Sequence, residues 1–168
     1  MAQRRGISNV VATIILIAIA IALAVAVAVW VFGLAGSVSK TATLQVQAVG
    51  LTGVSSGSAT LTLLISNPSS SGIGINGFTL GSLSCVFSAP VQVPAGTQGG
   101  QLTITLPITN GQFSTSSVTV SGTGGISVSS SMTVSCSGSQ TAAVGIQYSG
   151  YLTTVSGQTY PFTVTASS

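Results

Sequence analysis

The stretch from Val10 to Ala35 constrains the fold of this chain more than any other part of its sequence. It contains no charged residue, and Thr13 is its only polar side chain. In a helix, about 25 residues extend roughly 37 Å at 1.5 Å per residue, whereas about 20 suffice to cross a bilayer. Because the run is apolar on every side, it offers no polar face to water. We therefore expect a helix surrounded by lipid or by other copies of itself.

Within this run, alanines alternate with larger aliphatic residues from Ala18 to Val29. A period of two is typical of a strand, but a lone strand in lipid would leave its backbone groups unpaired. In a helix, two residues advance about 200°, so the alanines form two stripes on nearly opposite faces. Small residues let helices approach closely, which favours helical neighbours on several sides, and a plain membrane anchor is the alternative. The residues expected in a core of packed helices are Ile14, Ile15, Ile17, Ala18, Ile21, Ala22, Val25 and Val29.

The rest of the chain is almost free of charge. The whole chain of 168 residues includes three Lys and Arg, which are Arg4, Arg5 and Lys40, and no Asp, Glu or His. General acid–base catalysis, activation of a serine nucleophile and metal coordination depend largely on the missing side chains. We therefore expect no enzymatic activity, no metal and no cofactor. Three cations are also too few for a nucleic-acid-binding patch.

The missing carboxylates and histidines also predict how the protein responds to acid. Acid unfolding arises mainly from carboxylates that must be protonated and from buried histidines that must become charged. Since the chain has neither, its free energy of unfolding should hardly change between about pH 1 and pH 8. Thermal melts followed by circular dichroism at pH 2 and pH 7 should have the same midpoint, and a large fall at pH 2 would contradict the prediction.

The first residues form a short basic segment in front of the apolar run. Arg4-Arg5-Gly6 precedes Ile7-Ser8-Asn9, and the long apolar stretch follows at once. This order resembles the class III signal of archaeal type IV pilins and archaellins. In that family a prepilin peptidase cuts after the glycine, which implies cleavage between Gly6 and Ile7. Bacterial type IV pilins carry a glutamate as the fifth residue after the cut; here Val11 takes that place, which favours the archaeal branch.

The resemblance implies a homo-oligomer, a helical filament outside the cell whose core is made of the apolar helices. It also implies a precursor in the cell membrane, an assembly ATPase with its membrane platform, and adhesion to surfaces as the role. The positive-inside rule places Arg4 and Arg5 in the cytoplasm and the C-terminal part of the chain outside. A single-span membrane protein with a surface β domain and an archaellin are the alternatives.

From Thr41 onwards the sequence indicates β-structure. Short alternating apolar segments are separated by Gly, Pro, Asn and Ser, which is typical of an antiparallel sandwich or barrel. Asn76-Gly77 predicts a tight hairpin turn. We therefore expect an α+β protein with a leader (1–6), a long N-terminal hydrophobic helix (7–36) and an all-β, immunoglobulin-like antiparallel sandwich (37–168). Strands are expected at 44–48, 59–66, 73–80, 85–93, 101–108, 118–120, 126–136, 142–152 and 160–166.

Two kinds of covalent modification are expected in the β domain. Cys85 and Cys136 form an even pair in a part of the chain placed outside the cell, where disulfides form; two buried free thiols are the alternative. Ser and Thr make up roughly a third of the residues after Gly36, a bias that suggests O-linked glycans. N-linked glycans are not expected, because Asn67-Pro68-Ser69 is blocked by its proline and no other Asn has a hydroxyl residue two positions on.

Overall fold

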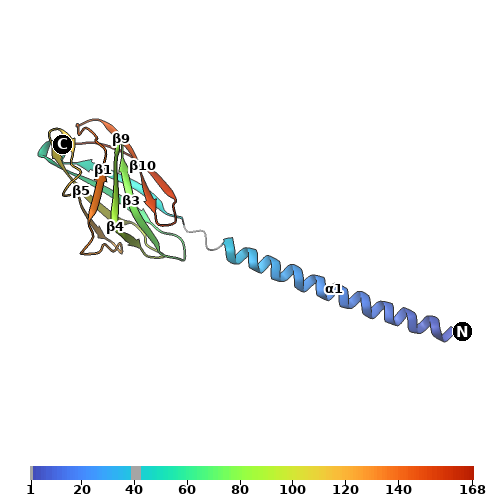
Figure 1. Cartoon of the computed structure of the whole chain (residues 1–168). Coiled ribbons are helices and arrows are strands. Elements are labelled where there is room, and N and C mark those ends of the chain that lie inside the picture. Colours follow the sequence, from blue (N-terminus) through green and yellow to red (C-terminus); the bar gives the residue numbers. More distant parts are fainter. Residues whose placement is uncertain (1, 39–42) are drawn as a thin grey trace. The chain divides into compact units, whose positions relative to one another are not determined.

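The computed structural model describes the backbone of residues 2–38 and 43–168, and the side chains of 7–33 and 43–168. The chain divides into two units, Met1–Thr41 and Ala42–Ser168. The first unit is a helix, α1 (Ala2–Val38), and the second is a β domain (Figure 1). The predicted α+β class is confirmed, since one long apolar helix is followed by two antiparallel sheets.

Helix α1 covers the whole predicted helical segment and extends beyond it at both ends. Its 37 residues span about 56 Å at 1.5 Å per residue. The Gly6–Ile7 bond, where cleavage is predicted, lies within the first two turns of α1. The side chains of Arg4 and Arg5, and Lys40 as a whole, lie outside the described residues.

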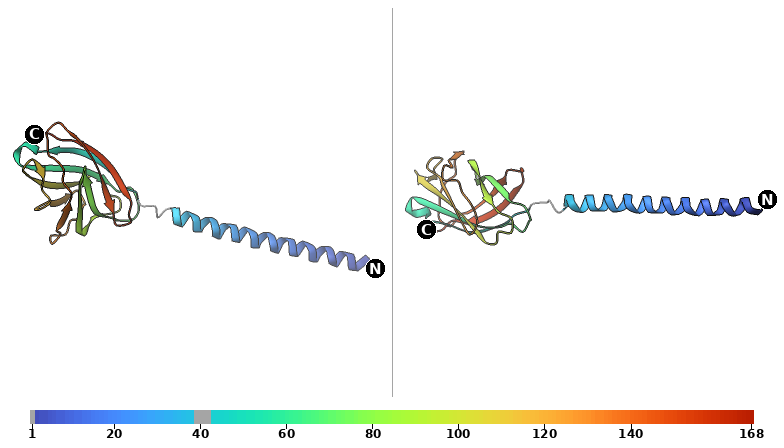
Figure 2. Two further views of the ribbon diagram at one scale, coloured as in Figure 1. Left: turned by 45° about the horizontal axis from the view of Figure 1, so that its top comes forward. Right: turned by 90° about the horizontal axis from the view of Figure 1, so that it is seen from below.

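The β domain is a sandwich of two sheets (Figure 2). In the first, the order is β1 (Gln45–Thr52), β2 (Ser58–Ser66) and β5 (Gly100–Thr109), with β6 (Gln112–Phe113) and β7 (Thr119–Thr123) both pairing with β5. In the second, the order is β10 (Thr159–Thr165), β9 (Gln147–Thr154), β3 (Ile73–Leu80), β4 (Leu83–Val93) and β8 (Val134–Ser137). A short 3-10 helix, η1 (Val54–Ser56), joins β1 to β2. This order, with the first, second and fifth strands in one sheet, is immunoglobulin-like.

The core lies between the two sheets and follows from strict alternation along the strands. In β2, every second residue from Ala59 to Ile65 is fully buried, and the residues between them are half-buried. Leu61 and Leu63 lie directly opposite Ile104 and Leu102 of β5, so both strands turn the same face inward. Each buried aliphatic side chain contributes about 1.5–3 kcal/mol relative to exposure. The largest fully buried side chains are Phe78, Leu51, Leu61, Leu63, Ile65, Ile75, Leu80, Leu83, Leu102, Ile104, Leu106 and Leu152.

The segment after β10 links the two sheets at one edge of the sandwich. Ala166 forms a parallel bridge with Leu51 at the end of β1. The backbone N–H of Ser167 donates to Leu51 O (2.8 Å), and the N–H of Val54 donates to Ser167 O (3.2 Å). These bonds occupy backbone groups that would otherwise be free at the edge of β1.

The predicted hairpin turn at Asn76-Gly77 is wrong. Both residues lie inside β3, where the register shifts between Ile75 and Gly77 in a β-bulge. A Cβ atom at Gly77 would lie 2.4 Å from the carbonyl oxygen of Cys85, so the bulge requires a glycine. The other Asn-Gly pair does form a hairpin: Asn110 (φ 53°) and Gly111 (φ 73°) connect β5 to β6, as two successive positive φ values allow.

Two predicted strands are shorter in the structure. Of 126–136, only the last residues enter β8, because the run Ser129–Ser131 forms a turn in which the N–H of Met132 donates to Ser129 O (3.1 Å). Of 142–152, the part before Gln147 is not strand, because Gly145 has a φ of 84°, which a strand cannot accommodate.

Tyr148 fixes the entry to β9. Its buried hydroxyl donates to Thr141 O (2.7 Å) and accepts from the N–H of Ala143 (3.0 Å). Its ring packs edge-on against Phe113, with 5.6 Å between the centroids. A tyrosine bonded to the backbone a few residues upstream, at the start of this strand, is the tyrosine corner of immunoglobulin-like domains.

Asn67 is fully buried at the end of β2, and it joins two loops. Its backbone N–H donates to Thr97 O (2.8 Å), and its carbonyl accepts from the N–H of Gly96 (3.0 Å). Its side-chain Oδ1 accepts from the N–H and the hydroxyl of Ser69. Its Nδ2 donates to the carbonyl oxygens of Ser71 (2.9 Å), Val93 (3.1 Å) and Pro94 (3.2 Å).

A disulfide joins Cys85 to Cys136, with an S–S distance of 2.01 Å. The two residues lie directly opposite each other in neighbouring strands, β4 and β8. In antibody domains the disulfide joins the two sheets, whereas here it fastens the four-residue edge strand β8 to its only neighbour in the sheet.

Candidate functional site

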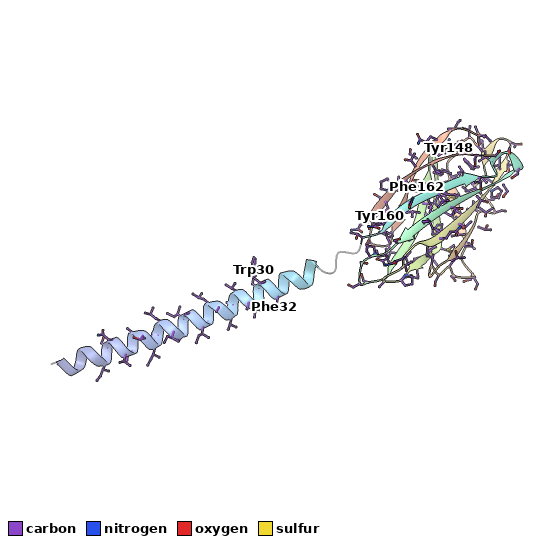
Figure 3. The ribbon with its side chains drawn as sticks, turned by 180° about the vertical axis from the view of Figure 1, so that it is seen from behind. Trp30, Phe32, Tyr148, Tyr160 and Phe162 are labelled. Carbon is purple, nitrogen blue, oxygen red and sulfur yellow. A yellow bond between two sulfur atoms is a disulfide. The ribbon has the colours of Figure 1, made fainter. Side chains whose placement is uncertain are left out.

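The apolar surface of α1 is the most unusual feature of the molecule. The segment Ile7–Gly33 is long and apolar enough to cross a membrane, which is compatible with a membrane anchor or a signal sequence. Each of its residues is exposed, and Leu16 and Trp30 both keep 67% of their surface accessible. Figure 3 shows these side chains projecting from the helix all around its axis, with Trp30 and Phe32 labelled. Apolar area left in water is unfavourable by about 25 cal/mol per Å², so this surface requires lipid or protein against it.

The residues predicted for a helical core lie together on one side of α1. At 100° per residue they occupy an arc of about 160°, with Val25 and Ala18 near its middle and Ile17 and Ile15 at its borders. The six aliphatic side chains among them are between 53% and 61% exposed, apart from Val29 at 67%. The structure therefore brings this set together as one continuous surface.

The opposite side of α1 is equally apolar. Leu16, Leu23 and Trp30 recur every seven residues, and all three are more than 60% exposed. The hydroxyl of Thr13, the one polar side chain from Val10 to Gly33, donates to Asn9 O at 2.7 Å within the helix, so it needs no outside partner. A helix of this kind can accept apolar neighbours on more than one side.

The β domain offers neutral surfaces. After Lys40 the sequence has no Asp, Glu, His, Lys or Arg, and within the described residues no group of metal-ligating side chains occurs. Open hollows are lined by neutral residues: one of about 440 Å³ lies between β7 and β8, beside Val120, Met132 and Val134. Such hollows can bind by shape, stacking and neutral hydrogen bonds.

Sequence reasoning missed one exposed aromatic residue, Tyr151 in β9, which is 43% exposed and lines a hollow on the outer face of the second sheet. Alternation within 142–152 could have shown that the side chain of Tyr151 points to the opposite face of the strand from that of its inward-facing neighbour Leu152. Which residues of β3 and β4 lie beside Tyr151 depends on strand order and register, and alternation reveals neither.

Comparison with models of known protein families found no match to this chain. Comparison with curated proteins likewise found no significantly similar sequence.

Proposed function

We propose that this protein is the structural subunit of an extracellular helical filament of the archaeal type IV pilus kind, with a role in surface adhesion. The observation that carries the proposal is helix α1: each residue from 7 to 33 is exposed and almost all are apolar, and the helix is joined to a separately folded β domain. In the filament, α1 packs against the helices of other copies and the β domains face outward.

Assembly begins in the membrane. The apolar segment spans the bilayer with Arg4 and Arg5 in the cytoplasm. A prepilin peptidase cuts between Gly6 and Ile7, and an assembly ATPase with its membrane platform drives the subunit into the filament. The contacts are head-to-tail, so the polymer grows without closing.

Hydrophobic burial would hold the assembled filament together in water. The predicted core arc alone has six large aliphatic side chains, all more than half exposed in the single copy. At about 1.5–3 kcal/mol for each, their burial contributes on the order of 10 kcal/mol per subunit. No ion pair is needed, which suits a chain without carboxylate side chains.

O-linked glycans on the β domain are part of the proposal. Thr115–Ser117 and Ser129–Ser131 are runs of exposed hydroxyl residues in loops between strands. A sugar coat would keep an uncharged surface soluble. Mass spectrometry of peptides from native material would locate the glycans and would also show whether the mature chain begins at Ile7.

The proposal predicts that enlarging the alanine stripe prevents assembly without preventing membrane insertion. In an Ala18→Leu/Ala22→Leu variant, hydropathy is preserved but two helices can no longer approach closely at these positions. We expect the variant in the membrane fraction in normal amount, and at least about a tenfold loss of filaments in electron micrographs of sheared surface material.

A matched control is Leu23→Ile, which conserves volume on the opposite side of α1. It should leave filaments in normal number. Native particles that are single copies in detergent would show instead a membrane-anchored surface domain. Filaments unaffected by the Ala18→Leu/Ala22→Leu substitution would refute close packing of α1 at these two positions.

A further inference from the structure

The outer face of the second sheet carries a shallow groove along β3. Strand register places Tyr151 of β9 beside Thr79 of β3, and Thr79 beside Ser84 of β4. In the next row, Gly77 lies between Thr153 and Val86. An open depression of about 110 Å³ lies at these two rows, lined by Gly77, Thr79, Val86, Tyr151 and Thr153.

A second hollow continues along the same strand. Gly74, three residues before Gly77, is half-buried, and the hollow beside it measures about 400 Å³. Its walls are Pro90 and Gln92 of β4 on one side and Val155 after β9 on the other. Glycine within a strand weakens it and often marks a close approach by a ligand or another backbone. The bulge explains Gly77, and at Gly74 a Cβ atom would lie 3.0 Å from Cγ2 of Val155 and 3.2 Å from Cβ of Pro90, so a larger residue would crowd the walls of the hollow.

The walls of the groove combine an aromatic ring with neutral polar groups. Of the seven aromatic side chains in residues 43–168, Tyr151 is the exposed one, and the other six are buried or half-buried. Asn76 and Gln92 provide amides, and Thr153 and Ser84 provide hydroxyls. An exposed aromatic surrounded by polar side chains is the composition of a recognition site rather than of a plain solvent face.

The charge of the surface selects the class of ligand. The sequence after Lys40 has no acidic, basic or histidine side chain, so an ionised ligand would lose hydration in the groove without gaining a partner of opposite charge. A neutral carbohydrate loses no ionic hydration. Its C–H faces stack on an aromatic ring, and its hydroxyls exchange hydrogen bonds with amides and hydroxyls.

We propose that the groove over Gly74 and Gly77, with Tyr151 as its stacking platform, binds neutral oligosaccharides. The sugar can belong to a foreign surface or to glycans on a neighbouring copy of the chain. This inference deepens the adhesion role in the proposed function, and it is testable on single copies without a filament. A filament that forms but binds no sugar overturns the inference and leaves the filament proposal intact.

The test uses the full chain produced without glycans, in micelles of a phosphocholine detergent, because glucoside and maltoside detergents would compete. The probes are immobilised neutral oligosaccharides of mannose, glucose, galactose and N-acetylglucosamine, and matched oligosaccharides that contain uronic acid or sulfate. A separate arm uses O-glycans released from the native protein. We expect binding to at least one neutral class, and binding in the second arm alone would identify the neighbouring copy as the source of the ligand.

Variants locate the site. Tyr151→Ala should weaken binding by about tenfold, whereas Tyr151→Phe should keep it within about threefold because the stacking surface remains. The backbone N–H of residue 151 still donates to Thr79 Oγ1 in both variants (3.1 Å in the native chain), so the sheet is preserved. Val144→Ala trims a side chain that is 50% exposed and does not line the groove, and it should change nothing. No binding to neutral sugars, preference for acidic ones, or binding unaffected by Tyr151→Ala would each overturn the inference.

Discussion

Replacing Asn67 with aspartate should produce a domain that is stable in acid and strongly destabilised at neutral pH. The native side chain is fully buried, and its Nδ2 faces three carbonyl oxygens, those of Ser71, Val93 and Pro94. An aspartate has the same shape, but when ionised it places a negatively charged oxygen against these carbonyls. When protonated, it can still donate one hydrogen bond there.

The direction of the pH dependence follows from proton binding. Burial and the three carbonyl oxygens raise the pKa of an aspartate at position 67 above its value of about 3.9 in the unfolded chain. Between these two pKa values the folded state holds a proton that the unfolded state has released, so the free energy of unfolding falls as pH rises. We expect a loss of about 1–2 kcal/mol at pH 2, from the missing donor. The loss should grow by a further 3–5 kcal/mol by pH 7, the usual penalty for an unpaired buried charge.

The measurement is urea unfolding of the full chain in micelles at pH 2, 4 and 7. Asn110→Asp is the matched control, because Asn110 is exposed in the β5–β6 turn with a φ of 53°, which aspartate tolerates. It should follow the native chain, whose stability is expected to be independent of pH. Equal midpoints for Asn67→Asp at pH 2 and pH 7, or greater stability at pH 7, would refute this account of the buried amide.

Removing the disulfide should have the second largest effect on the stability of the β domain. Cys85 and Cys136 are 51 residues apart, and closing a loop of that length stabilises the folded state by about 4 kcal/mol in the chain-entropy model. The total free energy of unfolding of a domain of this size is about 5–15 kcal/mol. The Cys85→Ala/Cys136→Ala variant should therefore unfold at a much lower urea concentration.

The loss of stability in the Cys85→Ala/Cys136→Ala variant should be greatest around β8. Strand β8 has four residues and β4 as its only neighbour in the sheet, so without the covalent bond this edge opens more easily. Amide hydrogen exchange should accelerate at Val134–Ser137 more than at β2, which is paired on both sides. Reduction of the native protein should reproduce the variant's midpoint, and an unchanged midpoint in both samples would contradict the prediction.

The sequence predicts the elements of this fold better than it predicts their neighbours. The helix follows from an uncharged apolar run, and β2, β3, β5 and β10 follow from alternation, because both signals are local. Asn76-Gly77 misleads because a bulge, like a hairpin turn, can require a glycine. The sequence does not reveal the turn at Ser129–Ser131, because the apolar residues on either side of it suggest one continuous strand.

The helical site could be predicted because its residues come from one continuous segment. Ala18, Ala22 and Val25 share a face through helical geometry alone. The groove on the second sheet could not be predicted from the sequence, because Gly77, Val86 and Tyr151 come from three strands that only the register of that sheet brings together. The partners of Asn67 were equally hidden, because Val93 is 26 residues away in the chain.

The hydrogen bonds between Ser167 and the end of β1 set the order of events during synthesis. Leu51 and Ser167 are 116 residues apart, so the first strand of the domain cannot complete its edge until Ser167 has left the ribosome. The apolar helix, in contrast, emerges first and depends on local bonds alone. In the assembly proposed above, membrane insertion therefore precedes closure of the sandwich, and the nascent chain would already be tethered when its β domain folds.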